Sequence, residues 1–226
     1  MWNEGWDSLF SRMEWGKYPD VEVVRYFSRA YKEKREGVRV LEVGCGPGAN
    51  LFFLAREGFS PYGIDGSKVA IERAEKRLKA DGLKAELQVG DISKLPYADG
   101  FFDAVLDCEC LYANSKAHSR GMLKEIARVL KPGGRFFSLT FATGTYGDGN
   151  GEKLAGEPNT YTKIHKGALH SDYGLIRFTS EEEIQDLYGK DFDIRSVEYV
   201  VRSMLDRKEQ IKEWLIACEK KSEKRG

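Results

Sequence analysis

Three short segments combine glycine with acidic residues at a spacing that suits the binding of a nucleoside. The turn Gly44–Gly48 follows Glu42, Asp65 stands 21 residues after Gly44, and Asp91 follows Gly90. Glycines let the backbone approach a ligand closely, and a helix behind such a turn offers free amide groups to a negative charge. A carboxylate at Asp65 can accept hydrogen bonds from two neighbouring ribose hydroxyls, and one at Asp91 can accept from an adenine amino group.

Each of these segments comes at the end of a predicted strand. β-Branched and apolar residues predict strands at 38–43, 61–65, 85–89, 102–108 and 135–141, and helical periodicity predicts helices at 50–56, 68–80 and 116–130. Strands and helices that alternate with short connections are typical of a doubly wound, mostly parallel α/β sheet with helices on both faces. In such a fold ligands bind at the carboxyl ends of the strands, so the three segments should meet at one edge.

The ends of the chain extend this core. A helix is predicted from Asp20 to about Glu36, with Pro19 at its start, and a second, short helix begins at Thr179. The runs 192–201 and 211–218 are interpreted as an antiparallel hairpin, although the second run also fits a helix. Without an internal repeat or a linker, residues 1–226 are predicted to form one domain.

Composition narrows the class of protein. Lys plus Arg and Asp plus Glu each number 36, and a balanced charge argues against a dedicated nucleic-acid binder. The sequence lacks an apolar run long enough to span a membrane and a recognisable export signal, so we expect a cytoplasmic protein without a membrane partner. The sequence does not indicate an oligomeric state.

The four cysteines carry no metal-binding pattern. Cys45, Cys108, Cys110 and Cys218 fit neither a disulfide framework nor a paired zinc site. We interpret them as reduced core or pocket thiols and predict no metal centre.

In these motifs the chain resembles the class I S-adenosylmethionine-dependent methyltransferases. The matching segments are VLEVGCGPGAN, YGIDGS, VGDISKLPYADGFFDAVLDCECL and ARVLKPGGRFFSLT, between Val40 and about Thr140. The resemblance implies a seven-stranded sheet with a reversed last strand. It also implies S-adenosylmethionine as cofactor, S-adenosylhomocysteine as product, and methyl transfer to an oxygen or nitrogen of a polar small molecule.

The resemblance also implies a role for each position of the motifs. Glu42 and the turn of Gly44, Gly46 and Gly48, with Cys45 within it, would hold the methionine end of the cofactor. Asp65 and Gly66 would bind the ribose, and Asp91 and Ile92 the adenine. Asp107 and Glu109 would form the floor near the sulfonium.

Two other functions remain open from the sequence. Gly44, Gly46 and Ala49 satisfy a loose form of the dinucleotide-binding fingerprint of NAD(P)-dependent oxidoreductases. Glu42, Pro47 and the Gly90-Asp91 pair fit the methyltransferase pattern better. A non-catalytic S-adenosylmethionine-binding protein is the third alternative, but none of the cofactor motifs is broken.

Two segments outside these motifs are candidates for covering the substrate. The aromatic leader 1–19 is interpreted as a lid whose Trp15 and Tyr18 contact the cofactor, or as a helix attached to the core. The long insertion 143–176 is expected to cover the substrate, because long loops inside a compact domain are usually functional. Its tyrosines and cations favour a sugar or sugar phosphate, and its His165 and His170, together with Glu109, are the candidate catalytic residues.

Overall fold

The main sheet has the predicted α/β architecture. The computed structural model describes residues 5–13, 16–169 and 174–222. Seven strands form one sheet in the order β3 (Glu86–Val89), β2 (Ser60–Asp65), β1 (Arg39–Val43), β4 (Phe102–Cys108), β5 (Leu130–Phe141), β10 (Glu209–Lys220), β9 (Phe192–Met204). The pairs from β3 to β5 are parallel, and β10 runs antiparallel to β5 and to β9. The seven-stranded sheet with its reversed strand is therefore confirmed.

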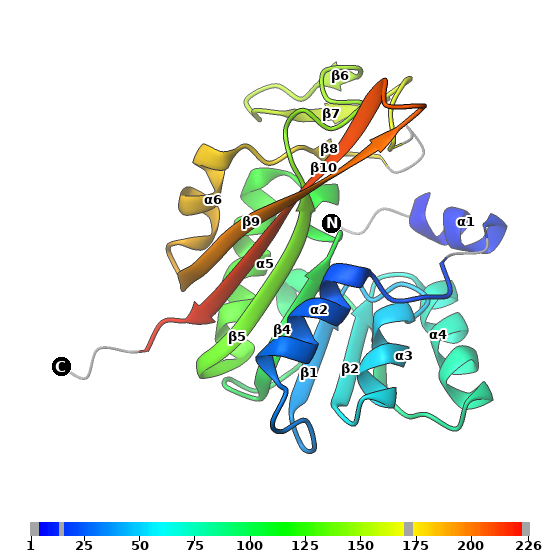
Figure 1. Cartoon of the computed structure of the whole chain (residues 1–226), viewed down its shortest axis with the longest axis vertical. Coiled ribbons are helices and arrows are strands. Elements are labelled where there is room, and N and C mark those ends of the chain that lie inside the picture. The colour runs from blue at the N-terminus through cyan, green and yellow to red at the C-terminus, as the bar shows by residue number, and fades with distance from the viewer. Residues whose placement is uncertain (1–4, 14–15, 170–173, 223–226) are drawn as a thin grey trace.

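Helices cover both faces of this sheet (Figure 1). On one face α2 (Val21–Ala30) and α3 (Ala49–Arg56) enclose a core with β1 and β4, and α4 (Lys68–Ala80) packs next to α3. On the other face α5 (Lys116–Val129) and α6 (Glu181–Tyr188) pack over β4, β5 and β10. This doubly wound arrangement leaves the carboxyl ends of β1 to β4 at one edge. No helix among the described residues is long and apolar enough to cross a membrane.

The helix predicted to reach Glu36 is shorter in the structure. Asp20 caps α2 by accepting from the amides of Glu22 (2.7 Å) and Val23 (3.4 Å), but the helix ends at Ala30. Tyr31 leaves the helical conformation, and its carbonyl accepts a hydrogen bond from Nε of Arg35 at 3.2 Å. The predicted extension of this helix to Glu36 was wrong. The charged residues after Tyr31 offer no apolar face that could pack against the sheet, so the chain leaves the helix there and turns toward β1.

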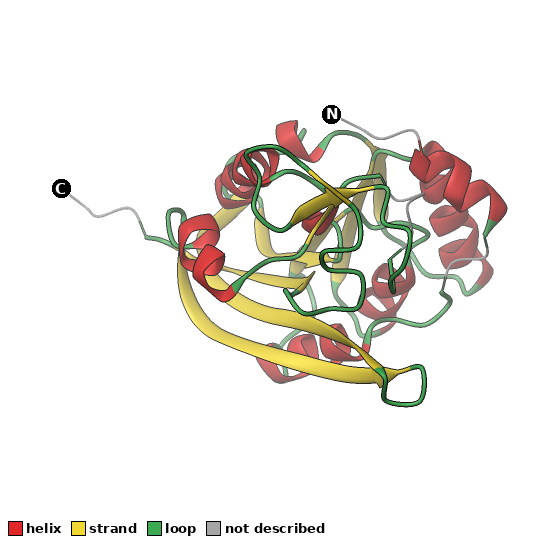
Figure 2. Cartoon of the chain, turned by 90° about the horizontal axis from the view of Figure 1, so that it is seen from above, coloured by secondary structure: helices red, strands yellow, loops and turns green. Residues whose placement is uncertain are grey.

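The C-terminal runs are both strands, so the hairpin is confirmed and the helical alternative is not. Trp214, Ile216 and Cys218 alternate along β10 and are buried on the α5 and α6 side. The hairpin is long, and Figure 2 shows it curving along one side of the molecule to an exposed turn. Its far end reaches beyond the parallel strands toward the insertion.

The insertion forms a small sheet of its own, which its sequence did not indicate. The strands β6 (Glu152–Lys153), β7 (Thr160–Thr162) and β8 (Ile176–Arg177) pair antiparallel and lie at the same end of the molecule as the hairpin turn (Figure 1). An apolar cluster joins this sheet to the main domain through Tyr112, Phe141, Ile164, Leu169, Ile176 and Phe178. The insertion is thus packed against the domain through these side chains.

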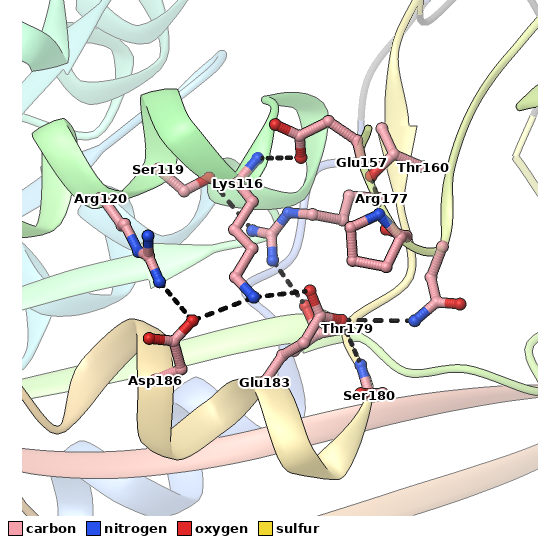
Figure 3. Close-up of polar contacts among 12 residues, drawn as sticks. Lys116, Ser119, Arg120, Glu157, Thr160, Arg177, Thr179, Ser180, Glu183 and Asp186 are labelled. Atoms are coloured by element: carbon pink, nitrogen blue, oxygen red, sulfur yellow. Dashed lines mark hydrogen bonds and ion pairs between the residues drawn. The ribbon is translucent and has the colours of Figure 1, made fainter. Parts of the chain in front are cut away.

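A buried arginine fixes the base of the insertion (Figure 3). Arg177 is 1% exposed and donates to the carbonyls of Asn114 (3.3 Å) and Leu111 (3.4 Å) and to the hydroxyls of Ser119 (3.1 Å) and Thr179 (3.2 Å). These partners are neutral, and two of them belong to the segment around the 3₁₀ helix η2 (Leu111–Ala113). Arg177 therefore holds β8 against the segment that follows β4.

Replacing Arg177 by alanine is expected to lower the free energy of unfolding by about 2–4 kcal/mol, because the variant leaves buried acceptors without donors. Urea denaturation followed by circular dichroism measures the loss. Arg120→Ala is the matched control, since Arg120 forms a half-exposed ion pair with Asp186, and it should cost no more than about 1 kcal/mol. Equal losses in the two variants would contradict the anchoring role of Arg177.

Candidate active site

A pocket of about 770 Å³ opens at the carboxyl edge of the sheet. It is lined by residues that follow β1, β2, β3 and β4, by α1 (Gly5–Arg12) and by the segment that leads into α2. The residues named from the sequence that line it are Tyr18, Glu42, Gly44, Cys45, Gly46, Asp65, Gly66, Asp91, Ile92 and Glu109. The three segments singled out in the sequence therefore meet at one cavity.

The glycine turn after β1 presents its backbone to this pocket. Gly44, Gly46 and Gly48 have φ values of 65°, 50° and 77°, in the left-handed region that favours glycine. The amides of Gly44 and Cys45 both donate to the carbonyl of Ile64, at 2.8 and 3.1 Å, which ties the turn to the end of β2. Gly48 then starts α3 as its N-cap residue.

Asp65, at the end of β2, is 5% exposed and organises the turn. One carboxylate oxygen accepts from the Gly46 amide at 2.8 Å and the other from the Ser67 amide at 2.8 Å. Burial raises the pKa of Asp65, while these two amides oppose the shift. A carboxylate has about four acceptor positions, so two remain for donors in the pocket, which suits a pair of ribose hydroxyls.

Glu42 lies on β1 at the pocket floor and is 2% exposed. Its Oε1 accepts from Nδ2 of Asn50 at 2.8 Å, but its Oε2 finds no hydrogen-bond partner among the described residues. Burial raises the pKa of Glu42 to about 8. A buried carboxylate oxygen without a donor is costly, so this position suits a cationic ligand group such as the ammonium of the methionine end.

The segment after β3 is open to solvent. Asp91 is exposed and its Oδ1 accepts from the amide (2.8 Å) and hydroxyl (2.7 Å) of Ser93. Partial burial raises the pKa of Asp91, but these two hydrogen bonds outweigh it and the pKa is lowered. Ile92 is buried, and Val89 is 47% exposed beside the pocket. An apolar surface next to an ionised acid suits an adenine ring with its amino group.

Asp107 does not line the pocket, which corrects its predicted place in the floor. It is fully buried, and it accepts from the amides of Cys110 (3.0 Å) and Leu111 (3.1 Å) and from the hydroxyl of Ser138 (2.6 Å). Burial raises the pKa of Asp107 to about 6, against the effect of these hydrogen bonds. Asp107 therefore supports the bend after β4 from below, and does not face a ligand.

Glu109, at this bend, does face the pocket. Its φ of 56° is unusual for a residue other than glycine, and its amide donates to the carbonyl of Leu139 at 2.9 Å. Burial and the neighbouring carboxyl of Glu213 raise the pKa of Glu109 well above its usual range. Strained residues with perturbed acidity are frequent at functional sites.

The leader contributes a helix to the pocket wall. In α1, Trp6 and Phe10 line the pocket, and Asp7 accepts a hydrogen bond from the hydroxyl of Ser67. Tyr18 also lines the pocket, although it is 80% exposed. Trp15 lies outside the described residues. The sequence showed the aromatic density of the leader but not that Trp6 and Phe10, four apart on one helix face, line the pocket.

The insertion reaches the pocket through an apolar residue. Leu169 lines it, whereas His165 is exposed and away from it, and His170 lies outside the described residues. The expectation of a sugar acceptor also rested on tyrosines and lysines of the insertion. Those that the structure describes do not line the pocket: Tyr146, Tyr161, Lys163 and Lys166. The structure therefore gives no support to a sugar or sugar phosphate as acceptor.

Asn50, Asp20 and Arg202 are among the pocket residues that the sequence analysis missed. Asn50 donates a hydrogen bond to Glu42. Asp20 caps α2 and also lines the pocket. Arg202 reaches the pocket from β9, far along the chain. Asn50 directly follows the glycine turn and could have been noticed. Nothing in the sequence indicates that β9 reaches this edge, because its position depends on the packing of the hairpin.

Comparison with known proteins agrees with this geometry. Residues 40–134 match a family model described as a methyltransferase domain. Over the whole fold, the chain is similar to an S-adenosylmethionine-dependent methyltransferase of Methanosarcina mazei, with a TM-score of 0.71 and 23% identity over 91% of this chain and 100% of that chain. Residues 40–134 thus carry a methyltransferase domain, and the chain has the fold of the class I S-adenosylmethionine-dependent methyltransferases. The family resemblance and S-adenosylmethionine as its cofactor are thereby confirmed, and the oxidoreductase alternative finds no support.

Relatives of this methyltransferase domain have diverse names. A fatty-acid O-methyltransferase of Mycolicibacterium smegmatis is 41% identical over 114 residues, which are 49% of this chain and 40% of that protein. A demethylmenaquinone methyltransferase of Tropheryma whipplei is 39% identical over 107 residues, which are 47% of this chain and 43% of that protein. These matches span less than half the length of either relative.

A second structural neighbour of the domain contains a ligand. It is the 1,6-didemethyltoxoflavin-N1-methyltransferase of Burkholderia thailandensis with bound S-adenosylhomocysteine, with a TM-score of 0.67 and 18% identity over 89% of this chain and 78% of that chain. At this identity the likeness shows the shared fold.

Proposed function

We propose that this protein transfers the methyl group of S-adenosylmethionine to an oxygen or nitrogen of a small molecule. The proposal rests on one observation, the convergence of Glu42, the glycine turn, Asp65 and Asp91 on a single pocket in the order that the cofactor requires. When bound, the cofactor supplies an electrophilic methyl group on a sulfonium. A zero net charge over the whole sequence is consistent with a small-molecule acceptor.

The chain's own residues would bind the cofactor along the sheet edge. Glu42 would accept from the ammonium of the methionine end, while Asp65 would accept from the ribose hydroxyls next to Gly66. Asp91 and Ile92 would bind the adenine. Trp6 and Phe10 of α1 would cover the cofactor and exclude water, which strengthens the polar contacts beneath them.

Glu109 would receive the proton that an acceptor group releases. It lines the same pocket as the glycine turn and as Leu169 of the insertion. A carboxylate within reach of the acceptor group can take up such a proton as a general base. His165, which does not line the pocket, stays a candidate only if the insertion moves toward the pocket on binding, and His170, outside the described residues, stays a candidate.

Binding measurements test the proposed function directly. Calorimetry is expected to show binding of S-adenosylmethionine and S-adenosylhomocysteine, and no binding of NAD or NADP at the same concentrations. Incubation with radiolabelled S-adenosylmethionine and a panel of phenols, amines and carboxylic acids then tests transfer. Tight binding of a nicotinamide cofactor without binding of the sulfonium compound would overturn the proposal, and binding without any transfer would favour the non-catalytic alternative.

Cofactor affinity is expected to rise with pH. Glu42, with a pKa of about 8, is mostly protonated at pH 6, and only its ionised form attracts an ammonium group. Raising the pH from about 6 to about 7 should therefore tighten cofactor binding by up to about tenfold. Calorimetry across this range measures the slope.

Two variants check the origin of this slope. Glu42→Gln should remove it, whereas Glu72→Gln, on the exposed face of α4, should keep it. A slope that persists in Glu42→Gln would show that another group titrates.

A further inference from the structure

The main sheet ends in a long strand whose outer edge pairs with no other described strand. β9 is the last strand in the sheet order, and its residues 196–204 pair without interruption with residues 209–217 of β10. Edge strands of soluble proteins are usually short or carry proline or lysine, because their free amides and carbonyls can pair with another chain. The opposite edge strand, β3, is short, whereas residues 196–204 contain neither proline nor lysine. We call these residues the β9 edge.

Apolar side chains line one face of the β9 edge. Directly opposite residues of an antiparallel pair share a face, so Val197, Tyr199 and Val201 lie on the side of Trp214, which faces α5 and α6. Their exposed fractions are 40%, 61% and 45%. The ring of Tyr199 packs edge-on against Trp214, with 5.9 Å between the ring centroids. This row of exposed apolar side chains suits contact with a second apolar surface.

The other face of the β9 edge carries one acid and one base. Glu198 and Arg202 are both exposed, and Glu198 lies opposite Leu215, which packs on the α2 side. The neighbouring Arg195 is already engaged, since its Nη2 lies 2.6 Å from Glu219. Glu198 and Arg202 stand two residues before and two residues after Val200. The two opposite charges are therefore placed symmetrically about Val200.

We propose that two copies of this chain pair antiparallel along the β9 edge, with Val200 of one copy opposite Val200 of the other. In this register Glu198 of each copy lies opposite Arg202 of the other, and Tyr199 lies opposite Val201. Two ion pairs form on one face of the joined sheet and two apolar pairs on the other, and such cross-strand pairs stabilise antiparallel strands. Since Arg202 also lines the pocket, Glu198 of the second copy would contact the rim of the site.

Other symmetric registers lack this match of charges. Opposite residues must share a face, so the centre of the pairing can lie only at a residue and not between two residues. A centre at Tyr199 or Val201 sets both charged residues opposite uncharged ones. A centre at Glu198 or Arg202 sets like charges opposite each other, which destabilises the pair. Charge complementarity along the β9 edge thus favours a second copy of this chain and one register.

Charge reversal tests the pairing in solution. Sedimentation velocity of the full chain is expected to show a dimer at about 10–100 µM, the range of a modest interface. Glu198→Arg and Arg202→Glu should each lose the dimer, because each sets like charges opposite each other. The two substitutions together should restore it, because the ion pairs form again with their signs exchanged. Glu75→Arg, on the exposed face of α4, is the matched control and should stay dimeric.

A disulfide tests the register itself. Val200→Cys would set two thiols opposite each other with about 4.5–5.5 Å between their Cα atoms, so oxidation should give a covalent dimer on a non-reducing gel. Val197→Cys would face Ser203 of the second copy and, like the wild type with its native cysteines, should give none. Circular dichroism checks that each variant is folded.

Three results would overturn the proposal. The first is a wild type that stays monomeric over the whole concentration range, which would leave the β9 edge unpaired or reserved for a different chain. The second is a dimer that both single reversals leave intact, or that the combined substitutions do not restore. The third is a dimer that Val197→Cys links but Val200→Cys does not, because the strands would then pair in another register.

Discussion

Replacing Asp65 by alanine is expected to weaken binding of S-adenosylhomocysteine by about 3–5 kcal/mol, or roughly one hundred to several thousand fold. Hydrogen bonds to a charged acceptor contribute about 1.5–3 kcal/mol each, and two ribose hydroxyls would lose theirs. The variant also frees the amides of Gly46 and Ser67, which the carboxylate holds at 2.8 Å in this structure. Isothermal calorimetry measures the dissociation constant.

Two further variants separate the loss of ribose recognition from a disordering of the glycine turn. Asp65→Asn keeps the shape of the side chain but presents one oxygen, so its affinity should fall between wild type and alanine. Asp81→Ala removes an exposed acid at the end of α4, away from the pocket, and should bind normally. A dissociation constant of folded Asp65→Ala within about twofold of wild type would contradict the assignment of the ribose site.

Gly44→Ala is expected to lower the free energy of unfolding by about 2–5 kcal/mol and to abolish measurable cofactor binding. The φ of Gly44 is 65°, which costs a residue with a Cβ about 1–2 kcal/mol. Its Cβ would also overlap Sγ and Cβ of Cys110, which adds about 1–3 kcal/mol of overpacking and pushes the turn away from the bend after β4.

Gly133→Ala is a matched control that introduces the backbone strain of a positive φ without a steric overlap. Gly133 has a φ of 71°, but its Cβ would meet open space. This variant should lose only about 1–2 kcal/mol and bind the cofactor normally. Urea denaturation and calorimetry compare the two proteins. If Gly44→Ala is as stable as Gly133→Ala and binds S-adenosylmethionine, the close approach of the turn to Cys110 is not a constraint.

The cofactor half and the acceptor half of the pocket differ in how they are built. The cofactor half consists of segments that each directly follow a parallel strand, so their convergence follows from the fold. The acceptor half joins residues far apart in sequence: Glu109 after β4, Leu169 in the insertion and Arg202 on β9. Variation in the insertion and hairpin can therefore change the acceptor without disturbing the glycine turn.

The sequence alone determined the α/β architecture and which segments meet at the pocket. Periodicity predicted the helix 68–80 and the strand 102–108 with the bounds that α4 and β4 have. Local chemistry placed Gly44, Asp65 and Asp91 at the ends of strands, and parallel strands bring such ends to one edge. These inferences succeeded because the interactions that decide them lie within a few residues of one another.

Only the tertiary structure decided what lies around that edge. Asp107 lies in β4 and Glu109 directly after it, two residues further, yet the bend at Glu109 leaves the first buried outside the lining and brings the second into it. The pocket brings Glu109 together with Arg202, residues more than ninety positions apart, through the registers of β10 on β5 and of β9 on β10. Such pairings depend on how the hairpin and the insertion pack, which a local pattern of residues does not encode.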